Sequence, residues 1–190
     1  MSQPVDQTPL YVDLDGTLIA SDLLFVSLQR FVRQTPWKAF LIPWWLLKGR
    51  ARLKAELARR VQINIEQLPY RPAILEFLRA QKRAGRRLIL ATGSNEHYAN
   101  LVAKHLGLFD AVLASDETTN RSGRNKLLDI RAQCGPDGFS YIGDSRKDII
   151  LWKEARQAFV VDHRPGLLRA VRSVCTPVAV FSETSRRASP

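Results

Sequence analysis

The chain has 190 residues, 45% of them hydrophobic, which suits one globular domain or one domain with a small insertion. Its net charge of +11 favours an anionic partner; because no nucleic-acid-binding motif accompanies the charge, we expect a phosphorylated substrate or an acidic membrane face and no nucleic acid. The two cysteines, Cys134 and Cys175, lack metal-ligand spacing, which argues against a disulfide-based or zinc-based fold and favours the cytoplasm. The longest apolar run, 39–47, is interrupted by Pro43 and is too short to span a bilayer.

The first predicted element is a buried strand at 10–12, and the motif Asp13-Leu14-Asp15-Gly16-Thr17 follows it directly. Two carboxylates two residues apart at a strand end repel one another unless a cation or a shared proton lies between them. This arrangement therefore indicates a site that holds a metal ion and carries out acid–base chemistry.

Residues 21–70 come next, and they contain helical patterns but no strand signal. We predict one helix over 23–31, a second that begins at Pro36 and ends before Gly49, and a third over 51–61. Because this segment interrupts the strand–helix alternation of the chain, we interpret it as a helical insertion that lies as a lid over the ligand-binding edge of the sheet.

From residue 73 onward, strands and helices alternate. The predicted strands are 87–91, 111–114, 139–142 and 158–161, and the predicted helices are 74–78, 95–106, 125–133 and 146–155. Together with 10–12, these strands predict an α/β fold with a mostly parallel five-stranded sheet covered on both faces. We divide the chain into a discontinuous core at 1–20 and 71–182, a helical cap at 21–70, and a polar tail or linker at 183–190.

Four polar motifs lie just past the ends of predicted strands: Asp13 to Thr17, Thr92-Gly93-Ser94, Lys126, and Gly143-Asp144-Ser145-Arg146-Lys147-Asp148. The second or the third alone is typical of a turn or a solvated side chain. Asp144 and Asp148 alone would fit acids that stabilise a helix N-terminus. That interpretation does not explain why Asp13 and Asp15 end another strand of the same sheet, so we predict one shared catalytic site.

In this order the motifs resemble those of the haloacid dehalogenase-like (HAD) phosphohydrolases, and the match runs from about Leu10 to Val161. The resemblance implies a Rossmann-like three-layer sandwich and hydrolysis of a phosphomonoester through an aspartyl-phosphate intermediate. Within this family, an acid at the position of Asp15 favours phosphatase or phosphotransferase chemistry over dehalogenation. The insertion after the first motif is similar to the helical C1 cap of phosphatases that include the phosphoserine phosphatases.

The resemblance also implies a role for each motif. Asp13 would be the nucleophile, and Asp15 would protonate the leaving oxygen and later deprotonate the attacking water. The cofactor would be Mg²⁺, which prefers hard oxygen ligands. Its ligands would be Asp13, the backbone carbonyl of Asp15, Asp144, and Asp148 either directly or through water. The phosphoryl oxygens would be bound by Thr92, Gly93 and Lys126.

A closer resemblance is to the HAD domain found N-terminal to UbiA-type prenyltransferases. It rests on segments of the core and the cap, namely Leu90 to Ser94, His105 to Asp110, Ala114 to Asp116, Pro36-Trp37 and Trp45 to Ala51. It implies a polyprenyl-phosphoryl sugar phosphate of the 5-phosphoribose type as substrate, a UbiA-type membrane partner, and a location at the inner face of the membrane. The alternatives are a soluble small-metabolite phosphatase of the phosphoserine phosphatase type and a regulatory HAD domain of a membrane prenyltransferase.

The predicted cap contains an apolar, aromatic segment followed by a basic segment. The first includes Trp37, Phe40, Leu41, Trp44 and Trp45, and the second includes Lys48, Arg50, Arg52, Lys54, Arg59 and Arg60. Two interpretations remain open. Either the aromatic residues form the core of the cap and the basic residues a solvated face, or the two segments bind the surface of an anionic membrane.

Overall fold

A six-stranded sheet forms the centre of the computed structural model, which describes residues 6–162 and 164–182. The strand order is β3-β2-β1-β4-β5-β6, and every neighbouring pair is parallel. The strands are β1 Leu10–Val12, β2 Leu88–Asn95, β3 Ala111–Ser115, β4 Ser140–Gly143, β5 Gln157–Asp162 and β6 Ala179–Ser182. The predicted parallel α/β sheet is confirmed, whereas the predicted number of five strands is wrong.

The strand that the sequence did not predict is β6, which pairs with β5 at the edge of the sheet. Its side chains alternate between partly buried and exposed. The ring of Phe181 packs on that of Phe77, with ring centroids 5.3 Å apart. Four residues give too short a periodic pattern to distinguish an edge strand from a loop, and long-range pairing decides the conformation here.

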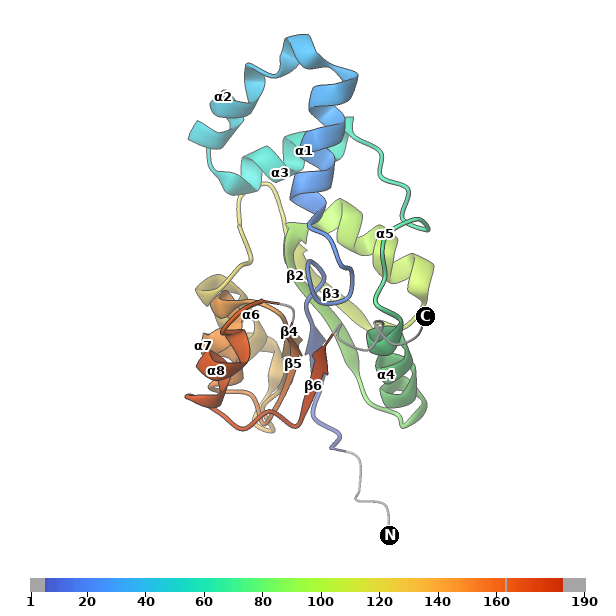
Figure 1. Ribbon diagram of the computed structural model, residues 1–190, viewed down its shortest axis with the longest axis vertical. Helices are drawn as coiled ribbons and strands as arrows, with labels where there is room; N and C mark the ends of the chain where they lie inside the picture. The colour runs from blue at the N-terminus through green and yellow to red at the C-terminus, as the bar shows by residue number, and fades with distance from the viewer. Residues whose placement is uncertain (1–5, 163, 183–190) are drawn as a thin grey trace, which may run out of the picture.

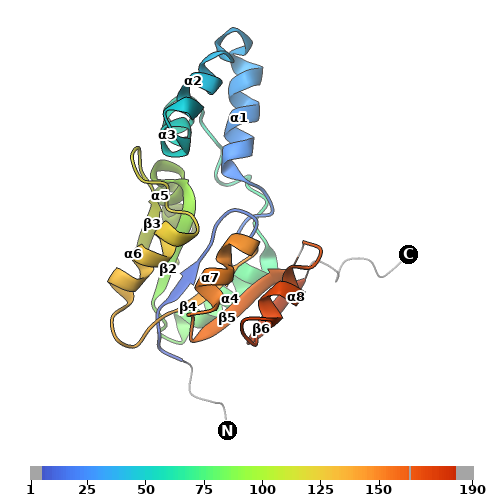
Figure 2. The ribbon, with the colours of Figure 1, turned by 90° about the vertical axis from the view of Figure 1, so that its left-hand side faces the viewer.

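Helices cover both faces of the sheet (Figures 1 and 2). One face is covered by α4 Pro72–Arg83 and α5 Glu96–Leu106, and the other by α6 Arg124–Cys134, α7 Ile149–Trp152 and α8 Leu167–Arg172. Successive residues of β1 point to opposite faces. Leu10 and Val12 belong to the apolar cluster that includes α4 and α5, and Tyr11 belongs to the cluster that includes α6, α7 and α8. The predicted Rossmann-like three-layer sandwich is therefore confirmed.

The segment between β1 and α4 is helical, and we refer to it as the cap. Its elements are α1 Leu23–Gln34, the 3₁₀ turn η1 Pro36–Lys38, α2 Leu41–Leu47 and α3 Arg50–Arg60. Asp22 begins α1, because its side chain accepts a 3.0 Å hydrogen bond from the amide of Phe25. Phe31 and Trp45 pack inside the cap, with ring centroids 5.3 Å apart.

Figure 1 shows the cap beyond the carboxyl ends of the strands, where open α/β sheets bind their ligands. The division of the chain into core and cap domains stays a prediction. The predicted tail at 183–190 lies outside the described residues.

Candidate active site

Backbone contacts bring the first and fourth motifs together at the carboxyl edge of the sheet. The amide of Asp13, just after β1, donates a 3.0 Å hydrogen bond to the carbonyl of Ile142 in β4. Gly16 has a φ of 79°, and a Cβ at this position would lie 2.2 Å from Oδ2 of Asp144. Both the backbone conformation and the lack of space therefore require glycine at position 16.

Asp13 forms a buried ion pair with Lys126 near the start of α6. The ammonium group donates a 2.8 Å hydrogen bond to Oδ1 of Asp13 and a 3.0 Å bond to the hydroxyl of Tyr141. That hydroxyl donates a 2.9 Å bond to Oδ1 of Asp148. Burial raises the pKa of Asp13 to about 8; Lys126 opposes this effect, and Asp148 and Asp144 add to it. The nucleophile candidate thus lies where a further cation would favour its charged form.

Asp13, Asp144 and Asp148 form a cluster of buried carboxylates. Each offers an oxygen atom, and these atoms lie within 4.8 Å of one another. Burial, together with the charge of Asp148, raises the pKa of Asp144 to about 6, against the effect of Arg164. The 3₁₀ turn η2 Arg146–Asp148 positions Asp148, whose Oδ2 accepts hydrogen bonds from the amide and hydroxyl of Ser145 at 3.1 and 2.8 Å. An all-oxygen set of this kind fits Mg²⁺.

Asp15 lies between the core and the first helix of the cap. Its Oδ1 accepts a 2.7 Å hydrogen bond from the amide of Leu23, and its Oδ2 accepts bonds from the hydroxyls of Ser94 at 2.5 Å and Thr92 at 3.3 Å. Burial, followed by the charge of Asp22, raises the pKa of Asp15 to about 6. The carboxyl group is therefore held in one orientation and favours retention of its proton.

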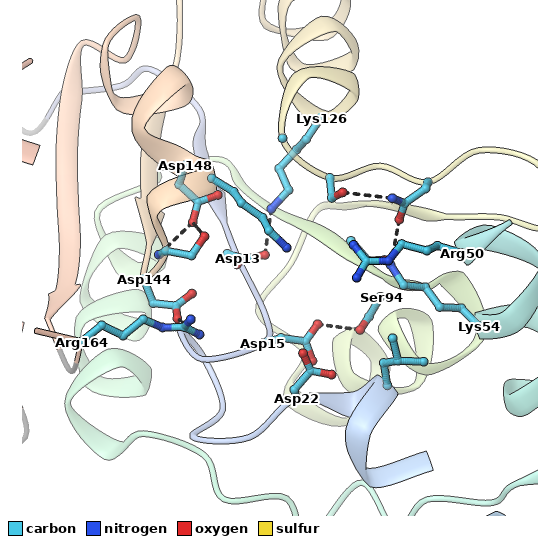
Figure 3. Close-up of a pocket in the computed structure, with 17 residues that line it drawn as sticks. Asp13, Asp15, Asp22, Arg50, Lys54, Ser94, Lys126, Asp144, Asp148 and Arg164 are labelled. Atoms are coloured by element: carbon cyan, nitrogen blue, oxygen red, sulfur yellow. Dashed lines mark hydrogen bonds and ion pairs between the residues drawn. The ribbon is translucent and has the colours of Figure 1, made fainter. Parts of the chain in front are cut away.

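A cavity of about 240 Å³ joins these groups to the cap. Figure 3 shows Asp13, Asp144 and Asp148 on one side of it and Arg50 and Lys54 on the opposite side. The core residues Gly93, Ser94 and Lys126 also line the cavity, whereas Thr92 is fully buried beside Asp15.

Lys54 in α3 connects the cap to the core. Its ammonium group donates hydrogen bonds to the carbonyl of Gly93 at 2.5 Å and to Oδ1 of Asn120 at 2.8 Å. Burial lowers the pKa of Lys54; Asp15 raises it, and the nearby charge of Arg50 lowers it. Positive groups of the cap therefore crowd around the mouth of the cavity.

Arg50 and Lys147 also line this cavity, and both are exposed. Neither side chain forms an ion pair with any residue in the described ranges 6–162 and 164–182. Two cations at the mouth are thus available to an anionic ligand.

The structure brings the sequence-predicted residues Asp13, Asp15, Gly93, Lys126, Asp144 and Asp148 around one cavity and places Thr92 behind it. Their predicted roles stay predictions. The sequence does not predict a role in the site for two hydroxyl groups. One belongs to Ser94 of the motif Thr92-Gly93-Ser94 and bonds to Asp15, and the other belongs to Tyr141 and bonds to Asp148. The one available signal for Tyr141 was a phenol in a strand that otherwise reads as buried.

Residues 10–153 match the sequence profile of the haloacid dehalogenase-like hydrolases. The uncharacterized protein y4nM of Sinorhizobium fredii is 38% identical over 154 residues, which cover 80% of this chain and 30% of that protein. The chain thus spans about 30% of the length of this curated relative.

Solved structures share the fold at low sequence identity. A protein of unknown function from Bordetella pertussis has a TM-score of 0.67 at 14% identity, covering 91% of this chain and 97% of that one. A phosphoserine phosphohydrolase-like protein from Francisella tularensis has a TM-score of 0.60 at 16% identity, covering 91% and 94%. A phosphoserine phosphatase in apo form has a TM-score of 0.61 at 15% identity, covering 93% and 94%. The predicted family is confirmed by the profile match, and this chain belongs to the haloacid dehalogenase-like hydrolases.

Proposed function

We propose that the chain is a Mg²⁺-dependent phosphomonoester hydrolase that works through an aspartyl-phosphate intermediate. The observation that carries the proposal is the buried contact of Asp13 with Lys126, next to Asp144 and Asp148, at the carboxyl edge of the sheet. Membership of a hydrolase family supports it. A structural carboxylate cluster would not need a buried carboxylate that lines a cavity and has a lysine beside it.

In the first step, an oxygen of Asp13 attacks phosphorus and the bond from phosphorus to the ester oxygen breaks. Asp15 gives its proton to the leaving oxygen. In the second step, Asp15 takes a proton from water, the water oxygen attacks phosphorus, and the bond to Asp13 breaks to release phosphate. The hydrogen bonds from Leu23 and Ser94 hold Asp15 in place for both transfers.

Three groups are proposed to bind the phosphoryl oxygens. Lys126 supplies a positive charge beside Asp13, and Gly93 supplies a backbone amide at the cavity wall. Thr92 supplies a hydroxyl, which in the structure is buried and donates to Asp15, so it would have to turn from Asp15 to the phosphoryl group. Mg²⁺ bound by Asp13, Asp144, Asp148 and the carbonyl of Asp15 would neutralise negative charge between the nucleophile and the phosphoryl group.

The cations at the mouth of the cavity support a substrate that carries a second anionic group. Arg50 of the cap and Lys147 of η2 both line the cavity that would hold the rest of the substrate. A polyprenyl-phosphoryl sugar phosphate of the 5-phosphoribose type carries a phosphodiester in addition to the phosphomonoester that is cleaved. The positive charges of the cap could bind this phosphodiester. A UbiA-type partner is part of the same proposal.

A second candidate is a small-metabolite phosphatase of the phosphoserine type. Asp22 lines the cavity together with Arg50, so a carboxylate and a cation are available for the amine and the carboxylate of an amino acid. Two of the similar structures also carry the name of phosphoserine phosphatase or phosphohydrolase.

The regulatory-domain alternative predicts no turnover of any phosphomonoester.

Hydrolysis of p-nitrophenyl phosphate with and without Mg²⁺ tests the activity. We expect turnover with the metal and loss of turnover on chelation. In Asp13→Asn we expect kcat to fall by a factor of about 10⁴ or more. Turnover that survives either change contradicts the mechanism. Circular dichroism of the variant shows whether its fold is retained.

Kinetics with the two candidate substrates separates them. Arg50→Gln and Lys147→Gln should raise the KM for the preferred natural substrate and leave the KM for p-nitrophenyl phosphate unchanged, with the exposed Lys153→Gln as control. Asp22→Asn preserves the helix cap. It should raise the KM for phosphoserine and not the KM for the polyprenyl-linked sugar phosphate; KM is the readout because the charge of Asp22 also raises the pKa of Asp15 and its loss would change kcat for both substrates.

A further inference from the structure

The outer edge of the cap carries a row of exposed apolar side chains. Trp37, Phe40, Trp44 and Leu47 are 68, 72, 56 and 83% exposed. They follow one another at spacings of three and four residues through η1 and α2, which places them on one side of this helical segment. We refer to these four residues as the aromatic stripe.

The aromatic stripe does not belong to the core of the cap. That core is formed by the opposite side of α2, where Trp45 is 6% exposed and packs on Phe31. Figures 1 and 2 place η1 and α2 in the part of the cap farthest from the sheet. No element of the described chain covers the stripe, and a contiguous exposed apolar surface of this kind marks an interaction site.

The charges around the aromatic stripe have one sign. Between Asp22 and Glu56 the sequence contains no acidic residue, and the exposed cations Arg33, Lys38 and Lys48 lie in or next to the helical segment that carries the stripe. The other basic residues of the cap are engaged elsewhere: Arg50 and Lys54 line the cavity, and Arg52 pairs with Glu56 and Glu117. The ammonium group of Lys48 lies 4.9 Å from the ring centroid of Trp44, so a cation borders the stripe directly. A surface that is apolar inside and anionic outside complements this arrangement.

We propose that the aromatic stripe inserts into the interface of an anionic lipid membrane, with the cations of the cap against the lipid headgroups. A second copy of the chain fits less well, because it would bring the same cations together with no carboxylate between them. The segment lies in the plane of the membrane: α2 has seven residues, and no helix within 6–162 and 164–182 is long and apolar enough to cross a bilayer. The proposal is independent of the hydrolase activity.

Vesicle flotation with the full chain tests the proposal. One set of vesicles contains phosphatidylcholine and phosphatidylglycerol in equal parts, and the other contains phosphatidylcholine alone. We expect the wild-type chain to float with the anionic vesicles only. The affinity of Trp44→Ala/Leu47→Ala for these vesicles should be lower by a factor of about ten or more. The matched control is Leu101→Ala/Leu128→Ala, which removes exposed leucines from α5 and α6 and should bind like wild type.

Brominated lipid gives a second readout. The exposed Trp37 and Trp44 should be quenched, whereas Trp152, which is fully buried in the core, should not. Circular dichroism spectra and melting temperatures should be equal in wild type and in Trp44→Ala/Leu47→Ala, which shows that the variant is folded. Equal flotation of that variant and wild type overturns the proposal. It is also overturned if wild type does not float, or if light scattering shows a dimer that the variant loses.

Discussion

The ammonium group of Lys126 lies 2.8 Å from Oδ1 of Asp13, and this ion pair joins two residues that are 113 positions apart in the sequence. Both side chains are buried. Lys126 contacts Asp13, and the guanidinium of Arg164 lies 3.0 Å from Oδ2 of Asp144, so two cations face a cluster of three carboxylates that carries excess negative charge when all three are ionised. That imbalance explains why the site fits a divalent cation and an anionic phosphoryl group together.

Replacing Lys126 by Met should lower the kcat for p-nitrophenyl phosphate about 10²–10³-fold, because a charge that contacts the reacting group is removed from a buried site. Tyr141→Phe keeps the ion pair and removes one hydrogen-bond acceptor of the Lys126 ammonium group, so kcat should fall by a factor of about ten at most. Steady-state kinetics measures both. A Lys126→Met enzyme as active as wild type contradicts the assignment.

Mg²⁺ should raise the melting temperature of the chain, because a ligand that binds the folded state stabilises it. Asp144→Asn removes one carboxylate of the cluster and should abolish the shift. The exposed Asp137→Asn is the control and should keep it. Differential scanning calorimetry with and without the metal gives the answer, and an equal shift in Asp144→Asn and wild type argues against this metal site.

Gly16→Ala should both destabilise the chain and abolish its activity. The new Cβ would lie 2.2 Å from Oδ2 of Asp144, at a φ of 79°. Gly85→Ala is the matched control: its φ is 82°, but nothing lies within 4 Å of the new Cβ. We expect a loss of about 1 kcal/mol in the free energy of unfolding for the control, from backbone strain alone. A Gly16→Ala enzyme with the activity of the control contradicts the predicted contact.

Glu56 in α3 should make the stability of the chain depend on pH. Burial opposes its charged form, but the hydrogen bond and charge of Arg60, with the charges of Arg52 and Arg59, lower the pKa below 4.5 overall. Because the folded-state pKa lies below the unfolded one, this contribution is present above pH 4.5 and is lost as the pH falls through the folded-state value.

Urea denaturation of wild type and Glu56→Gln at several pH values measures this contribution. The difference in the free energy of unfolding should be largest near neutral pH and shrink toward acidic pH. The exposed Glu76 on α4 forms no ion pair in the described residues, so Glu76→Gln should show no such trend. A difference that is independent of pH contradicts the role of the charge.

The central part of the site was predictable from sequence because the carboxyl ends of parallel strands meet at one edge. Asp13 after β1 and Asp144 after β4 lie on adjacent strands, and the spacing from Asp144 to Asp148 is one turn. The strand count failed at β6, where a four-residue edge strand has no distinctive pattern.

The remaining parts of the site depend on tertiary placement. The sequence identifies Arg50 and Lys54 as basic residues of the cap, but only the position of α3 brings them to the cavity. Similarly, Thr92 and Ser94 lie two positions apart in the same motif, but only the position of the loop after β1 brings Asp15 against both of their hydroxyls.

The most direct test of the proposed mechanism is mass spectrometry of the chain after rapid acid quench during turnover of p-nitrophenyl phosphate. Asp15→Asn should be used beside wild type, because it slows attack by water more than release of a nitrophenolate, which needs no proton. We predict one added phosphoryl group on the peptide that contains Asp13, labile to base, with more of it in Asp15→Asn. Substrate consumption with no adduct at any quench time, or an adduct on a different residue, would contradict Asp13 as the nucleophile.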